Sequence, residues 1–391
     1  MKKILVLNHF PTVYPPRSGG TLRYFHLYNQ LSNYYDITLL SQSLSEVGER
    51  VEFSPTFREY KVQKDPLHKQ ISKEIQNKEM KYELPLIVNM KVSEQMTEYK
   101  RYYDDLYKTS DIIIHESPYL LKYDRYLGVD HKPRIYNSHN HEFLLAEQLW
   151  TNKKARKYLQ SIYELEKKLV ENADLIFATS EDERNSFLSM YNLDSSKIKL
   201  APNGINPEEW IRRTMKSNGK TEALFIGANY PPNIEAVRYI LQHLADQCPD
   251  IQFIIAGSCC KTFEIPTKSN VILLGKVSHK QKLKLFSQAD IAINPMSLGA
   301  GVNIKTLEFL SAGIPLFSTP FGARGLNLID MKHYIRVEKE NFADKINTFC
   351  RDEKRLQKIA SRGQEYINKN YSWFKLAKNI KKEIDRLINQ I

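Results

Sequence analysis

The sequence predicts an α/β protein with two doubly wound parallel sheets. Short apolar runs of strand length alternate with helical patterns almost throughout the 391 residues, and this alternation is typical of parallel sheets with helices on both faces. A chain of this length exceeds one typical hydrophobic core and suits two domains of nearly equal size. Apolar residues make up 42% and charged residues 26% of the chain, as in an ordinary globular protein.

Ten apolar runs are expected to form the strands. In the first half they are residues 4–7, 37–40, 112–114, 135–137 and 175–178. In the second half they are residues 223–226, 253–256, 271–274, 291–294 and 316–318. Residues 201–210 lie between the two groups and are rich in Pro, Asn and Gly, so we expect them to connect the two domains.

Two further segments have helical patterns. Residues 373–391 are expected to form a final helix whose apolar stripe needs a partner surface. The stripe consists of Phe374, Ala377, Ile380, Ile384, Leu387 and Ile391. Docking of this helix on the protein is favoured over contact of its lysines with anionic lipid. Residues 45–110 carry amphipathic pieces at 67–80 and 94–108, and variable regions of this kind often hold specificity.

Charge and cysteine content limit which binding partners and which cellular location we expect for the protein. The formal net charge of +12 predicts an anionic partner. Nucleic acid is the least favoured, because there is no zinc-finger spacing and the basic residues are scattered. The four cysteines include no Cys-x-x-Cys pair, so we expect neither a zinc site nor a disulfide framework, and we expect a cytoplasmic location. No apolar run approaches the ~20 residues of a transmembrane helix, and the N-terminal apolar stretch is too short for a secretory signal.

The segment from Gly299 to Pro315 has the strongest chemical pattern. Gly299 and Gly301 allow the backbone to turn its amides outward at the start of a helix, where unpaired N–H groups and the helix dipole favour a phosphate. Lys305 adds a mobile positive charge. Glu308 follows on the same helical face, where its carboxylate can accept the protons of a diol. Phosphate and diol together indicate a nucleoside diphosphate, and the alternative is an ordinary loop with a solvated lysine and glutamate.

The order Gly-x-Gly, Lys, Glu and Gly-x-Pro in this segment resembles the donor-binding signature of the family-4 nucleotide-sugar glycosyltransferases (GT4). The resemblance implies the GT-B fold, in which two Rossmann-like domains face a central cleft and the C-terminal helix crosses back to the N-terminal domain. It implies an acceptor-side domain at residues 1–202 plus about 373–391 and a donor-binding domain at residues 203–372.

The glycine pair Gly19 and Gly20 leads into a helix after the first strand, where open α/β sheets bind ligands. It is similar to the family's Gly-Gly loop, which approaches the donor diphosphate. Arg23 follows on the first turn of that helix, and we expect it on the surface rather than in the site.

A histidine loop follows the fourth strand of the first half. Its His139, Asn140 and Glu142 resemble the family's His-Asn-x-Glu segment, whose histidine contacts the transferred sugar. The resemblance therefore implies that His139 is a catalytic residue and leaves His141 as the weaker candidate. The alternative is that both are surface histidines in a loop.

In the second domain, Gly227 and Asn229 stand where other branches of the family place an arginine and a lysine. Ala300 stands where the family has the first carboxylate of a Glu-x7-Glu pair, so backbone amides of residues 300–303 are expected to hold the sugar. Residues near Lys276 are expected to lie near the nucleobase of the donor. The resemblance implies as donor-binding residues Gly19, Gly20, Gly227, Asn229, Lys276, Val277, Gly299, Ala300, Gly301, Val302 and Asn303, and as catalytic residues His139, Lys305 and Glu308.

The resemblance implies a retaining, metal-independent glycosyltransferase of the hexosyltransferase type, with a nucleotide-diphosphate sugar as donor and no cofactor. Its acceptor would be a glycan or a lipid-linked glycan of bacterial surface polysaccharide synthesis. The alternatives are a nucleotide-sugar epimerase of the same fold and a catalytically silent nucleotide-sugar-binding subunit. The donor sugar, the base, the acceptor and the linkage are not determined by the sequence.

A basic run at Lys153, Lys154, Arg156 and Lys157 follows the histidine loop. It predicts a peripheral contact with anionic lipid at the inner face of the cell membrane. The alternative is a solvated helix start.

Overall fold

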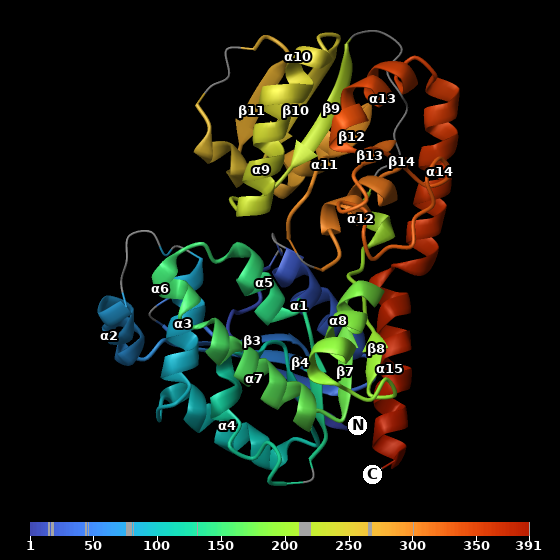
Figure 1. The fold of residues 1–391 in the computed structure, drawn as a ribbon. Coiled ribbons are helices and arrows are strands. Elements are labelled where there is room, and N and C mark those ends of the chain that lie inside the picture. Colours follow the sequence, from blue (N-terminus) through green and yellow to red (C-terminus); the bar gives the residue numbers. More distant parts are fainter. Residues whose placement is uncertain are drawn as a thin grey trace. The chain divides into compact units, whose positions relative to one another are not determined.

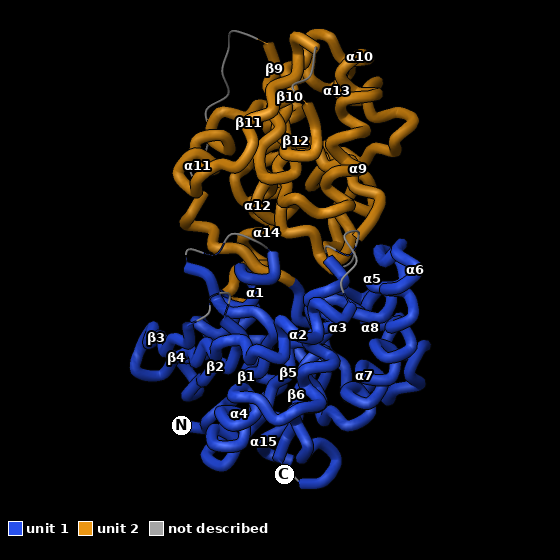
Figure 2. The backbone as a smooth tube through the Cα atoms, turned by 90° about the vertical axis from the view of Figure 1, so that its left-hand side faces the viewer, with its two compact units in different colours: residues 1–202, 376–391 blue, residues 203–375 orange. Residues whose placement is uncertain are grey.

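The computed structural model describes residues 1–14, 16, 19–43, 45, 47–75, 80, 82–130, 132–210, 220–264, 268–299 and 301–390. The chain forms two compact units, coloured separately in Figure 2. Unit 1 comprises Met1–Pro202 and Leu376–Ile391, and unit 2 comprises Asn203–Lys375.

Unit 1 is built on an eight-stranded sheet of order β3-β4-β2-β1-β5-β6-β7-β8. Figure 1 labels β3, β4, β7 and β8 of this sheet. Its strands are β1 Lys3–Asn8, β2 Asp36–Gln42, β3 Glu49–Ser54, β4 Phe57–Val62, β5 Ile112–His115, β6 Arg134–Asn137, β7 Leu175–Ala178 and β8 Ile198–Leu200. All neighbouring pairs are parallel except β3 with β4. The carboxyl ends of β1, β5 and β6 therefore lie at one edge of the sheet.

The helices of unit 1 cover both faces of this sheet. They are α1 Gly19–Leu31, α2 Pro66–Ile75, α3 Glu83–Val92, α4 Glu98–Thr109, η1 Pro118–Tyr123, α5 Glu142–Leu149, α6 Lys153–Arg156, α7 Leu159–Asn172, α8 Glu181–Tyr191 and most of α15 Trp373–Gln390. Leu5 and Leu7 of β1 share a core with residues of α2, α3 and α4. Ile4 and Val6 point to the opposite face and are equally buried, as expected for a strand covered on both sides.

Unit 2 has a six-stranded parallel sheet of order β11-β10-β9-β12-β13-β14. Its strands are β9 Thr221–Ile226, β10 Ile251–Ala256, β11 Val271–Gly275, β12 Ile291–Asn294, β13 Leu316–Ser318 and β14 Ile335–Arg336. Its helices are η2 Pro207–Glu209, α9 Pro231–Tyr239, η3 Ile240–Leu244, α10 Ala245–Gln247, η4 Ser258–Thr262, α11 His279–Gln288, α12 Ile304–Ser311, η5 Lys339–Asn341, α13 Phe342–Phe349 and α14 Glu353–Asn370. Ala223 and Phe225 of β9 pack against α9 and α13, whereas Leu224 packs with α11 and α12.

The final helix, α15, docks on unit 1 through its apolar stripe, as the sequence predicts. Ile380 and Ile384 are buried, and Tyr35 after α1 donates a hydrogen bond to Asp385 Oδ1 at 2.7 Å. Phe374 of the predicted stripe is 56% exposed, and Leu376 is buried in addition to the predicted residues. Ile391, also predicted in the stripe, lies outside the described residues. None of the described helices combines the length and apolarity needed to cross a bilayer.

The two doubly wound α/β units and all ten predicted strands are confirmed. The amphipathic pieces of residues 45–110 form α2 and α4. The same region also contains β3, β4 and α3, which the sequence analysis did not identify. β3 and β4 pair with each other at the edge of the sheet and mix charged with apolar residues, so they lack the continuous apolar run of a central parallel strand.

Candidate functional site

In unit 2, a glycine turn precedes α12 at the carboxyl end of β12. Gly299 and Gly301 have φ values of +119° and +62°, in the left-handed region that favours glycine. Asn303 is the N-cap residue of α12, but its side chain makes no capping hydrogen bond. The first amides of α12 are therefore not satisfied by a side-chain cap and can bind an anion. Ala300, expected in the same turn, lies outside the described residues.

Lys305 lies on the first turn of α12. Its Nζ donates a hydrogen bond to Asn233 Oδ1 at 2.7 Å and lies 4.1 Å from the centre of the Phe225 ring. Burial lowers the pKa of Lys305 to about 7, because a partly desolvated ammonium loses hydration. The Lys305 amine is thus held by Asn233, whereas the sequence led us to expect a mobile side chain.

Glu308 lies one turn further along α12 and is 5% exposed. Its Oε1 accepts a hydrogen bond from Lys282 Nζ of α11 at 2.6 Å, and that ammonium lies above the rings of Trp210 and Phe286. Lys282 was not predicted from the sequence, since nothing in the local pattern of α11 distinguishes it from the neighbouring lysines. A diol at Glu308 would meet a carboxylate already oriented by this ion pair.

Close packing explains why a glycine stands at position 227, which was predicted to be a donor-binding residue. A Cβ on Gly227 would lie 2.8 Å from Asn233 Cγ, and a Cβ on Gly257 would lie 2.1 Å from the Gly227 carbonyl oxygen. The backbone N–H of Asn229 donates to Ser258 Oγ at 2.8 Å. The structure therefore brings Gly227, Asn233 and Lys305 together, and it uses the Asn229 amide within the unit.

The remaining predicted donor residues differ in their surroundings. The side chain of Val302 is buried in the core, and its carbonyl oxygen accepts from Asn203 Nδ2 at 3.1 Å. Lys276 is exposed and Val277 is half-buried after β11. Among the described residues, no hydrogen bond or ion pair joins these two to Lys305.

In unit 1, the glycine pair and the predicted histidine come together at the carboxyl edge of the sheet. Gly19 and Gly20 begin α1. A Cβ on Gly20 would lie 3.3 Å from the Phe10 ring and 3.9 Å from His139 Nδ1. His139 is 11% exposed, and its Nε2 lies 2.5 Å from Oε2 of the fully buried Glu116. Glu116 directly follows β5 and was not among the predicted site residues.

Arg23 is buried, so its expected surface position is wrong. It is 1% exposed. Its guanidinium donates to the Ala201 carbonyl oxygen at 2.7 Å and to Asn137 Oδ1 at 2.7 Å. The contact with residue 201 comes from a part of the chain that follows β8, so local sequence gave no signal of it.

The neighbouring His141 is held by the fold. It is the N-cap residue of α5, its Nδ1 lies 3.1 Å from Glu166 Oε2, and its ring stacks on Phe187 with ring centres 4.4 Å apart. Next to it, burial and the charge of Glu166 raise the pKa of Glu142 to about 8, and Tyr119 donates a hydrogen bond to this carboxyl group at 2.8 Å. Glu116 and Glu142 are both buried. Glu142 belongs to the predicted His-Asn-x-Glu segment but was not a predicted site residue, and Glu116 was not predicted from the sequence.

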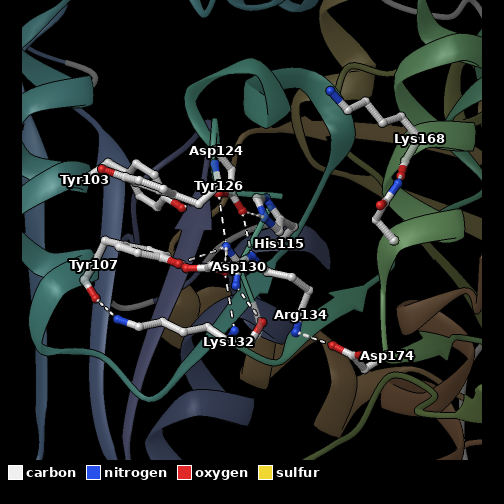
Figure 3. A network of polar contacts seen from close by, with 11 residues as sticks. Tyr103, Tyr107, His115, Asp124, Tyr126, Asp130, Lys132, Arg134, Lys168 and Asp174 are labelled. Carbon is white, nitrogen blue, oxygen red and sulfur yellow. Dashed lines mark hydrogen bonds and ion pairs between the residues drawn. The ribbon is translucent and has the colours of Figure 1, made fainter. Parts of the chain in front are cut away.

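A second polar cluster of unit 1 lies around Asp124 (Figure 3). Asp124 accepts hydrogen bonds from Tyr103 Oη at 2.5 Å and Arg134 Nε at 2.8 Å, and it lies 3.0 Å from His115 Nε2. Burial alone would raise the pKa of Asp124, but hydrogen bonds and charges from His115 and Arg134 outweigh it and hold the pKa below its ordinary value. Within the described ranges, no group of three or more His, Cys, Asp and Glu side chains is arranged to hold a metal ion.

Comparisons with known proteins agree with this architecture. A family model described as Glycosyltransferase Family 4 matches residues 91–209, and one described as glycosyl transferase-like matches residues 235–382. An uncharacterised glycosyltransferase of Methanocaldococcus jannaschii is 23% identical over an alignment of 418 residues that covers 100% of both chains.

Two solved structures share the fold over the whole chain. Sucrose-phosphate synthase from Thermosynechococcus elongatus has a TM-score of 0.78 at 14% identity and covers 100% of both chains. HepE from Anabaena, solved in complex with UDP-glucose, has a TM-score of 0.68 at 14% identity and covers 99% of this chain and 100% of that chain. The fold is therefore GT-B. Together with the two family models, it supports a GT4-like glycosyltransferase.

Proposed function

We propose that the protein is a retaining glycosyltransferase that moves a sugar from a nucleotide-diphosphate sugar to a glycan or lipid-linked acceptor. The single observation that supports it most is Lys305, held next to the helix start of α12 that lacks a side-chain cap. Amides and a lysine at one helix start suit a diphosphate. HepE, which has the same fold, binds UDP-glucose.

In this proposal the diphosphate is bound and then stabilised as it leaves. Lys305, with its lowered pKa, becomes fully charged beside the diphosphate, because a nearby anion favours the ammonium. The amides of α12 add fixed dipoles that need no reorganisation when negative charge develops on the leaving group. Glu308, oriented by Lys282, accepts from the ribose hydroxyls. For His139 we propose the role that the family resemblance implies, a contact with the transferred sugar.

The same residues supply positive charge without a metal ion, so we propose metal-independent transfer with no cofactor. Activity should then survive EDTA. Loss of activity with EDTA and its return with Mg²⁺ or Mn²⁺ would contradict this part of the proposal. We further propose a role in surface polysaccharide synthesis at the inner face of the membrane, supported by the net charge of +12 and the basic run at α6.

The proposed donor class can be tested by thermal unfolding of the full chain. Nucleoside diphosphates and their sugars should raise the melting temperature, since a ligand at about 100 times its Kd stabilises by about 2.7 kcal/mol. Lys305→Ala should lose most of this shift and about 100-fold in turnover, whereas Lys358→Ala, an exposed lysine of α14, should lose neither. The proposal fails if no nucleoside diphosphate or sugar derivative shifts the wild type.

A nucleotide-sugar epimerase is the second candidate. The buried Glu116 and Glu142, with the pKa of Glu142 raised to about 8, are carboxyl groups of the kind that acid/base chemistry on a sugar needs. The two candidates differ in their products. An epimerase converts the nucleotide sugar without an acceptor and releases no nucleoside diphosphate in stoichiometric amount, whereas the transferase releases one for each sugar moved.

A further inference from the structure

A buried chain of hydrogen bonds runs through unit 1 to His139. It links Arg23, Asn137, Glu116 and His139, which come from α1, the end of β6, the residue after β5 and the histidine loop. Arg23 is 1% exposed, Glu116 1% and Asn137 2%, so water does not compete for these bonds. His139 is the last residue of this hydrogen-bond network and its most exposed member, with a side chain that is 11% exposed.

Chemistry sets the direction of each bond in this chain. A guanidinium has only donors, so the Asn137 atom that lies 2.7 Å from Arg23 must be the carbonyl oxygen. The amide nitrogen of Asn137 must then face Glu116, to which it donates at 2.7 Å. The Tyr28 hydroxyl donates to the same carboxylate oxygen, Oε1. The other oxygen, Oε2, is left to accept from His139.

Glu116 Oε2 lies 2.5 Å from His139 Nε2. Because the carboxylate accepts, Nε2 must carry the hydrogen, and in the neutral imidazole the lone pair is then on Nδ1. Nδ1 faces the first turn of α1, where a Cβ on Gly20 would lie 3.9 Å away. Among the described residues, Nδ1 has no hydrogen-bond partner.

We propose that Glu116 is a positioning residue that holds His139 in the Nε2–H form, so that Nδ1 accepts a hydrogen bond from a hydroxyl of the transferred sugar. The sugar-facing role of His139 rests on the proposed function, whereas the state of its ring follows from unit 1 alone. The carboxylate also fixes the ring plane, in the way that a second partner orients a catalytic histidine.

Glu116→Gln tests the proposal because it exchanges donor and acceptor in the hydrogen bond between residue 116 and His139. Asn137 is held by Arg23 and keeps its nitrogen toward residue 116, so the glutamine oxygen must face Asn137 and its NH₂ group must face His139. Nε2 then has to accept, and the hydrogen moves to Nδ1. Nitrogen-15 NMR of the side chains of the ten histidines reports this directly, with the signals of His139 assigned by their absence in His139→Gln.

We expect Nε2–H in the wild type and in Glu116→Asp, and Nδ1–H in Glu116→Gln. A wild type with hydrogen on Nδ1, or a Glu116→Gln variant with an unchanged tautomer, would overturn the proposal. The wild-type measurement alone decides the first of these outcomes, so the test holds even if the variant folds poorly.

Turnover gives the second measurement. Glu116→Gln should lower kcat at least about tenfold, the cost of one lost hydrogen bond to the substrate, with a smaller change in KM, and Glu116→Asp should recover part of it. The matched control is Glu94→Gln, an exposed carboxylate paired with Lys122. Full turnover in Glu116→Gln with the tautomer reversed would overturn the role of Nδ1. Absence of any transfer by the wild type would instead refute the proposed function and leave the NMR result standing.

Discussion

Two histidine–carboxylate pairs of unit 1 have the same chemistry and different surroundings. His115 lies 3.0 Å from Asp124, and the side chains are 1% and 0% exposed. His139 lies 2.5 Å from Glu116, and the side chains are 11% and 0% exposed. Both pairs start at the carboxyl ends of the neighbouring strands β5 and β6. The first pair is closed off from solvent, whereas the histidine of the second pair is partly exposed.

The two carboxylates also differ in their counter-charge. Asp124 is bonded directly to Arg134, which is itself 3% exposed, so its charge is balanced inside the protein. Among the described residues, Glu116 accepts from Tyr28 and Asn137, and Asn137 in turn accepts from Arg23. Removing one partner of a buried ion pair destabilises a fold, because it leaves the other charge buried and uncompensated. A buried carboxylate that bonds a partly exposed histidine can orient that ring for chemistry.

Asp124→Asn should have the largest effect on stability. It leaves the buried Arg134 without its counter-charge, and breaking such a pair costs about 3–5 kcal/mol. Urea unfolding of the full chain measures this loss. Glu94→Gln, at an exposed ion pair, should change stability by less than about 1 kcal/mol. Equal unfolding midpoints for Asp124→Asn and the wild type would remove the distinction between the two pairs.

Lowering the pH should weaken the ion pair of Asp124 with Arg134. The pKa of Asp124 is lower in the folded protein than its ordinary value, so its contribution is complete above the ordinary value and is lost as the pH falls from there through the folded value. The wild type should therefore lose stability over this acidic range more steeply than Asp124→Asn does. Parallel pH profiles of the two proteins would contradict the assigned ion pair.

His139→Ala should lower turnover rather than stability. We expect about a 100-fold loss of turnover, in the range for a group that acts on the substrate. The unfolding midpoint should change little, because His139 is the last member of the buried hydrogen-bond network. His115→Ala is the matched control and should lower stability while the folded fraction keeps its turnover. If His139→Ala unfolds the protein and His115→Ala does not, the roles have been assigned the wrong way round.

The comparison extends to Lys305 in unit 2, whose burial lowers its pKa to about 7. If Lys305 binds the diphosphate as proposed, it does so in its protonated form, so affinity for UDP or another nucleoside diphosphate should fall as the pH rises above about 7, by up to tenfold per pH unit. Lys305→Arg keeps its charge across this range and should show a flat profile. A wild-type affinity independent of pH between 6 and 9 would exclude Lys305 from the phosphate site.

The smallest effects are expected at fully exposed charges. Lys153, Lys154, Arg156 and Lys157 at α6 are all exposed, but Arg156 donates to the Trp150 carbonyl oxygen at 3.0 Å, so only the three lysines should be replaced. If they contact anionic lipid, each contributes about 1 kcal/mol, and salt weakens the contact. Co-sedimentation of wild type and the triple Ser variant with anionic and neutral vesicles measures this. Equal binding in all four cases would exclude the patch.

Local pattern was sufficient for most of the architecture. The ten apolar runs predict ten of the strands because parallel strands buried on both faces are apolar along their whole length. The turn at Gly299 and Gly301, and the spacing of Lys305 and Glu308, were likewise visible in the sequence, since positive φ and helical spacing leave direct signals in residue type. β3 and β4 left no such signal, because an edge pair is only partly buried.

The partners of the site residues were decided by the tertiary structure. Arg23 bonds to the carbonyl of residue 201, which is 178 positions away, and Lys305 bonds to Asn233 across 72 positions. Glu116 and Lys282 stand in segments whose local sequence only predicts a strand end and a helix. Residue type and spacing determine which chemistry a side chain can offer. Its burial, pKa and hydrogen-bond direction depend on groups that only the folded chain brings within 3 Å.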